Sequence, residues 1–176
     1  MKLIVISNPT NLNNEQEIIC SLFEAGMEIF HVYKPLFSKE EILNYIQEIP
    51  SQYHNKIVIH SDYFKFHSLK EMDDCKEEYS YAFLSPIFDS ISKAGYKSKF
   101  DLKELKSSPL LGRGAGGEVI ALGGIDENTI HEAVDLGFDG VAVLGAIWMS
   151  EDPLKNFIKL QCSLIAINTI QKEQHV

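Results

Sequence analysis

A short polar segment after an apolar run carries the side chains best suited to bind an anion. Residues 85–93 read Ser-Pro-Ile-Phe-Asp-Ser-Ile-Ser-Lys, so the hydroxyls of Ser90 and Ser92 stand next to the ammonium group of Lys93. Neutral hydroxyl donors, one cation and the amides of a loop are groups that bind phosphate. We therefore predict a phosphate-binding loop here, and the alternative is an ordinary polar turn with a solvated lysine.

Two glycine turns later in the chain point to the same chemistry. One apolar run ends in Gly123 and Gly124, and the next ends in Gly145. Glycines that directly follow a strand let backbone amides approach a ligand closely, and the N-terminus of the next helix favours an anion. Together the two turns predict a phosphate pocket, although either one alone could be only a tight turn.

These groups come together only if the apolar runs before them form one parallel sheet. The runs are rich in β-branched residues and apolar on both faces, as is typical of parallel strands covered by helices. Strands are predicted at residues 3–7, 29–34, 56–61, 81–86, 119–124 and 140–144. Helices are predicted at residues 14–25, 38–49, 68–78, 101–107, 126–136 and 152–169. The fold class is therefore α/β, either a TIM-type (β/α) barrel or an open doubly wound sheet, with ligands at the carboxyl ends of the strands.

Composition excludes several classes of function. The chain has 176 residues, a formal net charge of −9 and 45% hydrophobic residues, so we expect residues 1–176 to form one domain. The acidic balance argues against binding nucleic acid or a membrane surface, because both favour excess Lys and Arg. No apolar segment is long enough for a signal peptide or a spanning helix, and a cytoplasmic location is expected. Cys20, Cys75 and Cys162 are too widely spaced to indicate a disulfide framework or a zinc site.

The glycine-rich segment at residues 112–117 looks like a phosphate loop only superficially. It precedes a predicted strand and therefore lies at the amino end, away from the expected site. We interpret it as a connector.

The polar loop and the closing strands resemble a known family. Residues 85–93 resemble the Gly-Pro-Ile-Phe-x-Thr-x-Thr-Lys loop of thiamine-phosphate synthases and the related thiazole tautomerases, and residues 119–125 and 139–147 resemble the last two strands of that family. The resemblance implies a (β/α)8 barrel. It also implies a transferase that joins hydroxymethylpyrimidine diphosphate to a thiazole phosphate, releases diphosphate and uses Mg²⁺.

The resemblance assigns roles to the residues already singled out. It implies that Ser90 and Ser92 hold phosphate oxygens and that Lys93 neutralises charge on the leaving diphosphate. It also implies that the thiazole phosphate contacts the backbone amides of three glycines, Gly123, Gly124 and Gly145.

The second predicted strand departs from the pattern of the family. His31-Val32-Tyr33-Lys34 stands where the family has Gln-x-Arg-x-Lys, so a phenol replaces the arginine that grips the pyrimidine diphosphate. A phenol cannot replace a bidentate guanidinium group. We expect His31 and Tyr33 to remain at the substrate, and Lys34 to compensate in part if its side chain points into the site.

The metal-binding side and the middle of the chain depart as well. His60-Ser61 replaces an Asn-Asp pair that helps to place magnesium, so His60 is predicted to contact substrate and Asp62 could serve as a metal ligand only after a register shift. Phe66 runs directly into His67, where the family has two further strands. Only six strands are predicted, about two short in the middle, so the barrel is expected either to be open or six-stranded or to have lost a two-strand segment.

His67 begins a His-Ser-Leu-x-Glu segment that resembles one in thiazole tautomerases, where the histidine is the proposed acid–base group. Imidazole suits this role because it titrates near neutral pH. The alternative is that His67 only begins the following helix.

Three functions remain open. The synthase-like transferase comes first, the isomerase second, and a non-catalytic or truncated relative that binds a phosphorylated ligand third. The closing helix at residues 152–169 is apolar on more than one face; we predict that it packs against the barrel, with a homodimer contact as the alternative.

Overall fold

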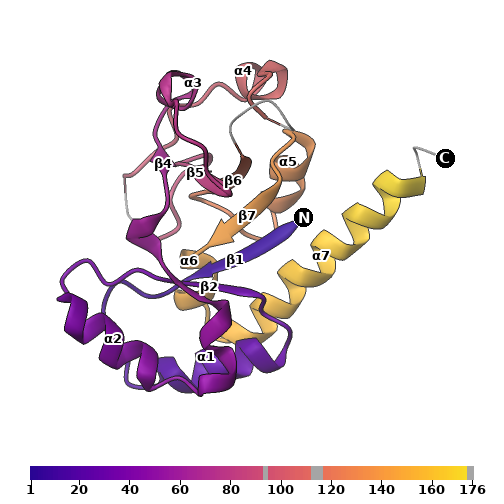
Figure 1. Cartoon of the computed structure of the whole chain (residues 1–176). Helices are drawn as coiled ribbons and strands as arrows, with labels where there is room; N and C mark the ends of the chain where they lie inside the picture. The colour runs from indigo at the N-terminus through magenta and orange to yellow at the C-terminus, as the bar shows by residue number, and fades with distance from the viewer. Residues whose placement is uncertain (93–94, 112–116, 174–176) are drawn as a thin grey trace.

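The computed structural model describes residues 1–92, 95–111 and 117–173; Lys93 and residues 112–116, which belong to the predicted connector, lie outside the described residues. Within these described residues, seven parallel strands form one curled sheet in the order β3-β2-β1-β7-β6-β5-β4 (Figure 1). The strands are β1 (Lys2–Ile6), β2 (Ile29–Val32), β3 (Ile57–Ile59), β4 (Lys65–Phe66), β5 (Tyr81–Leu84), β6 (Glu118–Leu122) and β7 (Gly140–Val143). The parallel (β/α) architecture predicted from the sequence is confirmed.

The side chains of the strands alternate between the two faces of the sheet, and each face contributes to a separate hydrophobic core. Successive side chains of a strand point to opposite faces. An inner core inside the curl contains Ile4, Ile6, Tyr81, Phe83, Ile120 and Ala142. A larger outer core lies between the sheet and the helices and contains Phe30 and Val32 of β2. His31, which lies between these two residues, and the half-buried Tyr33, which follows β2, therefore face the inside of the curl.

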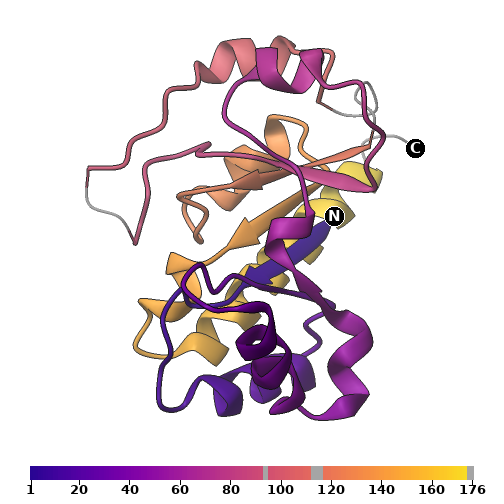
Figure 2. The same ribbon diagram turned by 60° about the vertical axis from the view of Figure 1, so that its left-hand side comes forward.

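Helices cover the outer face of the sheet. The regular helices are α1 (Glu15–Glu24), α2 (Lys39–Gln47), α3 (Leu69–Asp74), α4 (Leu102–Ser107), α5 (Ile130–Asp135), α6 (Gly145–Trp148) and α7 (Pro153–Glu173). Short 3-10 helices precede and follow β3, at η1 (Ser51–Lys56) and η2 (His60–Asp62). In both views α1 and α2 lie at one end of the molecule and α3 and α4 at the other (Figures 1 and 2). The predicted capping box at the start of α2 is present, with Ser38 and Glu41 satisfying each other's backbone amides.

The strand count predicted from the sequence is wrong by one. β4 is present directly before His67, and it pairs with β5 through Lys65↔Phe83 and Phe66↔Leu84. A two-residue strand is too short to leave an apolar pattern, which explains why it was missed. Seven strands still fall short of a full barrel, as the sequence predicted.

The curled sheet ends in two edges that are not paired with each other in the described part of the chain. One edge is β3 and the other is β4. A cavity lies between them, and we call it the wall opening. It is lined by Ile57, Val58, Ile59, Asp62, Tyr63, Phe64, Glu78, Tyr79, Ser80 and Tyr81. The missing middle of the barrel is therefore a gap in its wall.

The closing helix α7 packs against the body of the protein, as predicted. Phe157, Leu160 and Leu164 are buried, and α7 contacts α1, α5 and α6. Ile158 and Ile165 on the same helix are exposed. Within residues 1–92, 95–111 and 117–173, no helix combines the length and apolar character needed to cross a membrane.

Candidate active site

A pocket opens at the carboxyl ends of the strands, where parallel α/β proteins bind ligands. Its walls come from the ends of β1, β2, β3, β5, β6 and β7, from Lys65 of β4 and from the loop after β5. The lining residues are Ile6, Tyr33, His60, Lys65, Ser85, Ser90, Ile91, Ser92, Tyr96, Leu122, Gly123, Gly124, Ile125, Ala142, Leu144 and Gly145.

The glycine turns allow the loop after β5, which carries Ser90 and Ser92, to pack closely against the ends of β6 and β7. The loop is joined to β6 by two backbone bonds, from Ile87 N to Leu122 O at 3.0 Å and from Phe88 N to Gly123 O at 3.1 Å. A Cβ on Gly123 would stand 2.7 Å from Pro86 Cβ, and one on Gly145 would stand 2.9 Å from Ile91 Cβ. Any side chain at these turns would push the loop outward, so glycine is needed for close approach as well as for the positive φ of Gly123.

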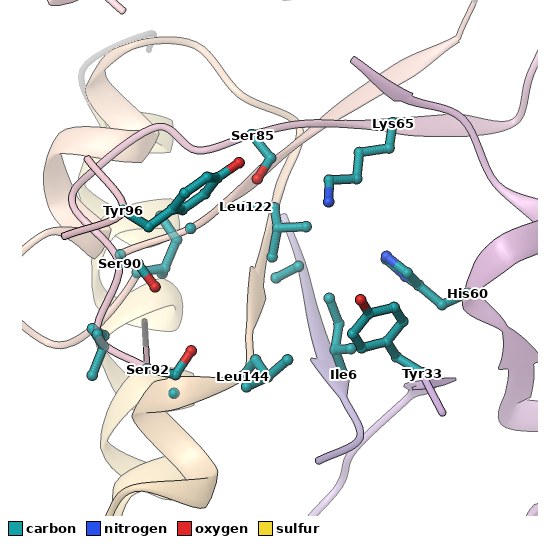
Figure 3. A pocket seen from close by; sticks show the side chains of 16 residues that line it. Ile6, Tyr33, His60, Lys65, Ser85, Ser90, Ser92, Tyr96, Leu122 and Leu144 are labelled. Atoms are coloured by element: carbon teal, nitrogen blue, oxygen red, sulfur yellow. The ribbon is translucent and has the colours of Figure 1, made fainter. Parts of the chain in front are cut away.

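One end of the pocket offers neutral donors to an anion. Ser90, Ser92 and Tyr96 lie together on the side of the loop after β5 (Figure 3). The backbone of Ser90 is fixed by a bond from its amide to the Tyr96 carbonyl at 2.9 Å. The structure thus brings Ser90 and Ser92 together with Gly123, Gly124 and Gly145, as the sequence predicted. Lys93, the predicted cation of this group, lies outside the described residues.

The opposite end of the pocket is aromatic and basic. Tyr33, His60 and Lys65 point into the pocket there, and the apolar side chains of Ile6, Leu122 and Leu144 lie between the two ends (Figure 3). The Tyr33 and His60 rings are 5.4 Å apart and meet edge to face. This arrangement suits a flat heterocycle that carries a phosphate at one end.

His60 rests on a second histidine that does not line the pocket. His60 Nδ1 lies 3.3 Å from His31 Nδ1, and His31 Nε2 lies 2.6 Å from the Tyr81 hydroxyl. Burial, with a smaller effect from His60, lowers the pKa of His31 to about 3, and burial together with the charge of Lys65 lowers the pKa of His60 to about 4. Both imidazoles are therefore neutral at pH 7. The contact with His31 fixes the orientation of the His60 ring.

The structure corrects the prediction for Lys34, which points away from the pocket. Its Nζ forms a buried ion pair with Glu15 Oε2 at 2.6 Å and donates to the Thr10 carbonyl at 3.0 Å. The cause is the alternation of the strand: Tyr33 faces the inside of the curl, so the next residue faces the helices. Lys34 therefore cannot replace the missing arginine.

His67 lies beside the pocket wall but does not line the pocket. Its Nδ1 donates to the Ser85 carbonyl at 2.9 Å, and its backbone amide donates to Glu71 Oε2 at 2.7 Å. Ser85 separates the ring from the cavity, since Ser85 lines it and His67 does not. Both contacts fit the alternative prediction that His67 begins a helix, whose N-cap is Ser68.

Comparison with known proteins relates this chain to a family model and to solved structures. Residues 65–147 match the family model described as thiamine monophosphate synthase. The fold superposes on a thiamine phosphate pyrophosphorylase from Bacteroides thetaiotaomicron with a TM-score of 0.76 and 29% identity, covering 92% of this chain and 96% of that one. Just under half of this chain is therefore similar to thiamine monophosphate synthases, and its fold is that of a thiamine phosphate pyrophosphorylase.

A second structure, the thiamine phosphate pyrophosphorylase from Pyrococcus furiosus, shares the fold of this chain. Its TM-score is 0.66 at 19% identity, covering 91% of this chain and 93% of that one. A comparison with curated protein sequences gave no match.

Thiamine-phosphate synthases generally use Mg²⁺, but the donor set around this pocket does not fit that ion. Mg²⁺ prefers carboxylate and other oxygen ligands, and no Asp or Glu lines the pocket within the described residues. Asp62, the predicted ligand, is exposed and lines the wall opening instead. Across residues 1–92, 95–111 and 117–173, no cluster of three or more His, Cys, Asp or Glu side chains could hold a metal ion.

The sequence prediction missed several lining residues, among them two whose side chains carry polar groups, Lys65 and Tyr96. Lys65 lies on β4, the strand that was not predicted, and Tyr96 lies in the long loop after β5. Lys65 could have been found only by recognising β4, because nothing else marks it out from other surface lysines. Tyr96 carries no sequence signal for the pocket.

Proposed function

We propose that this chain is a transferase of the thiamine-phosphate synthase type, which couples hydroxymethylpyrimidine diphosphate to a thiazole phosphate. The observation that carries the proposal is the pocket with a serine and glycine end, an apolar middle and an aromatic, basic end. The similarity of residues 65–147 to thiamine monophosphate synthases supports the same reaction class.

The proposed reaction exchanges one bond for another. The bond between the pyrimidine methylene carbon and the diphosphate oxygen breaks, and the diphosphate leaves with the electron pair. The thiazole nitrogen then donates its lone pair to that carbon and becomes a cationic ring nitrogen. No covalent bond to the protein is needed, so catalysis consists of positioning the rings and stabilising the charge that develops on the diphosphate.

The residues of the pocket, together with Lys93, which follows Ser92 in the sequence, divide these tasks. Ser90, Ser92 and the glycine turns hold the thiazole phosphate by neutral donors. Lys65 and Lys93 supply positive charge for the leaving diphosphate. Tyr33 and His60 flank the ring end and keep water away from the cationic carbon.

The test is formation of thiamine phosphate from the two substrates by folded protein, with and without added Mg²⁺. We expect turnover that Lys93→Ala lowers by about 100-fold, as is usual for loss of one charge-stabilising group. Lys97→Ala is the matched control, because Lys97 is an exposed lysine of the same loop that does not line the pocket. Absence of turnover from folded protein would reject the transferase.

A second candidate function is isomerisation of a phosphorylated thiazole. It is favoured by the absence of carboxylates from the described lining and by the neutral imidazole of His60, since this reaction needs neither diphosphate nor metal. Moving a ring double bond requires one proton to be removed and another to be delivered. Conversion of one thiazole phosphate tautomer to the other, followed by NMR, distinguishes the isomerase from the transferase.

A further inference from the structure

We propose that His60 is the acid–base group of this pocket and that His31, Tyr81 and Tyr63 form a proton relay from His60 to the wall opening. The inference deepens the isomerase candidate and rests on it for its substrate. The hydrogen-bond chain itself rests on distances between side chains of the protein and does not depend on the identity of the substrate.

Hydrogen bonds lead from the pocket to Tyr81, whose hydroxyl has Tyr63 as a further hydrogen-bond partner at the wall opening. His60 lines the pocket, and its Nδ1 meets His31 Nδ1 at 3.3 Å; His31 Nε2 meets the Tyr81 hydroxyl at 2.6 Å. The Tyr63 ring stacks on Tyr81 with centroids 4.5 Å apart. Tyr63 and Tyr81 both line the wall opening, while neither lines the pocket.

The Nδ1–Nδ1 contact couples the tautomers of the two histidines. In a neutral imidazole one nitrogen carries the proton and the other accepts. When Tyr81 donates to His31 Nε2, His31 Nδ1 carries the proton and donates to His60 Nδ1, so His60 Nε2 presents an N–H to the pocket. When His31 Nε2 donates to Tyr81, every bond reverses and His60 Nε2 presents a lone pair.

His60 can therefore act as a base and then as an acid without a charge remaining in the core. A proton leaves a carbon of the thiazole and binds to His60 Nε2, whose electron pair forms the new N–H bond. The Nδ1 proton of His60 passes to His31 Nδ1, and the Nε2 proton of His31 passes to the Tyr81 oxygen. The Tyr81 proton leaves toward Tyr63 and the wall opening, and delivery of a proton to the ligand reverses each step.

The surroundings favour transfer through neutral groups. His31 is fully buried and His60 nearly so, and ring contacts enclose them: Tyr63 at 4.9 Å and Phe83 at 5.1 Å from His31. Lys65 is the charged group whose effect on His60 is resolved, and it disfavours a second positive charge there. Burial, followed by hydrogen bonding to Tyr63, raises the pKa of Tyr81, so its phenol keeps a proton to donate.

The first test measures the tautomers directly. Long-range ¹H–¹⁵N NMR of the ligand-free protein at pH 7 reports which nitrogen of each histidine carries the proton. We expect Tyr81→Phe to change the tautomer ratio of His60 at least threefold, although Tyr81 does not touch the pocket. Tyr79→Phe is the matched control, because the Tyr79 hydroxyl is buried and has no hydrogen-bond partner among the described residues. An unchanged ratio in Tyr81→Phe would overturn the relay.

The second test adds the substrate. Folded protein is incubated with the phosphorylated thiazole in D₂O, and mass spectrometry follows deuterium entering the ring. We expect His60→Gln to slow exchange about 100-fold and Tyr81→Phe to lower kcat about 10-fold with KM unchanged. Exchange that survives His60→Gln but is lost in His67→Ala would overturn the assignment.

The outcomes separate the relay from the function on which it rests. No exchange by wild-type protein, with the NMR result as expected, would reject His60 as an acid–base group and the isomerase together. It would leave the transferase to be judged by its own assay. Correct folding of each variant is checked by far-UV circular dichroism.

Discussion

The buried ion pair between Lys34 and Glu15 makes a prediction that separates stability from ligand binding. The side chains of both residues are essentially inaccessible to solvent, and Glu15 also accepts from the Tyr45 hydroxyl at 2.9 Å. Lys34→Met leaves the Glu15 carboxylate buried with a phenol as its remaining side-chain partner. Breaking one side of a buried pair costs about 3–5 kcal/mol, whereas replacing both sides by apolar residues is often neutral. We expect Lys34→Met to lose about that amount and Lys34→Met/Glu15→Leu to recover most of it.

Urea unfolding provides the assay, followed by fluorescence of the single tryptophan, Trp148, and by circular dichroism. With a denaturant dependence of about 2 kcal/mol/M, the midpoint should fall by roughly 2 M in Lys34→Met. Lys39→Met, at an exposed position on α2, should stay within about 0.5 kcal/mol of wild type. The reasoning is refuted if Lys34→Met leaves stability unchanged and weakens binding of a phosphate ligand, because the lysine would then reach the pocket.

Three further results are expected. The pKa values of His31 and His60 lie below that of an unfolded histidine, so the unfolded chain binds more protons below about pH 6.5. Stability should be complete above that pH and should fall toward pH 4 by up to about 1.4 kcal/mol per pH unit for each histidine; a urea midpoint that stays flat between pH 7 and pH 5 would contradict this. Gly124→Ala should cost more stability than Gly26→Ala in urea titrations: both have positive φ, but only at Gly124 would the Cβ strike loop backbone, so equal losses would count against that contact. Tyr79→Phe should raise stability by about 1 kcal/mol in thermal unfolding, because it removes a buried hydroxyl without a partner in the described chain; a lower midpoint would show that the hydroxyl is satisfied.

The sequence predicted the parallel sheet and most of its strands because each strand is a continuous apolar run between turns. It also predicted the serine and glycine end of the pocket, since those residues lie in the loop after β5 and in the turns after β6 and β7. Local chemistry was sufficient in these cases. The capping box of α2 is read from Ser38 and Glu41 alone, whatever the rest of the fold.

The remaining parts of the site depend on contacts between distant segments. β4 exists because Lys65 and Phe66 pair with β5, and two residues carry no period of their own. Lys34 pairs with Glu15 of α1, a helix that precedes β2 in the chain. The direction of the Lys34 side chain therefore depends both on the face of β2 and on the position of Glu15. The link from His60 through His31 to Tyr81 joins η2, β2 and β5, and neither spacing nor composition indicates it.

During synthesis β1 leaves the ribosome first, yet in the finished sheet it lies between β2 and β7. Its register with β7 pairs Leu3 with Val141, and the indole of Trp148 donates to the Ile6 carbonyl at 2.6 Å. One edge of β1 therefore stays open until nearly the whole chain has been made, and such non-local pairing is slow to form. A nascent chain stopped before β7 would expose that edge, which makes incomplete chains candidates for chaperone binding and aggregation.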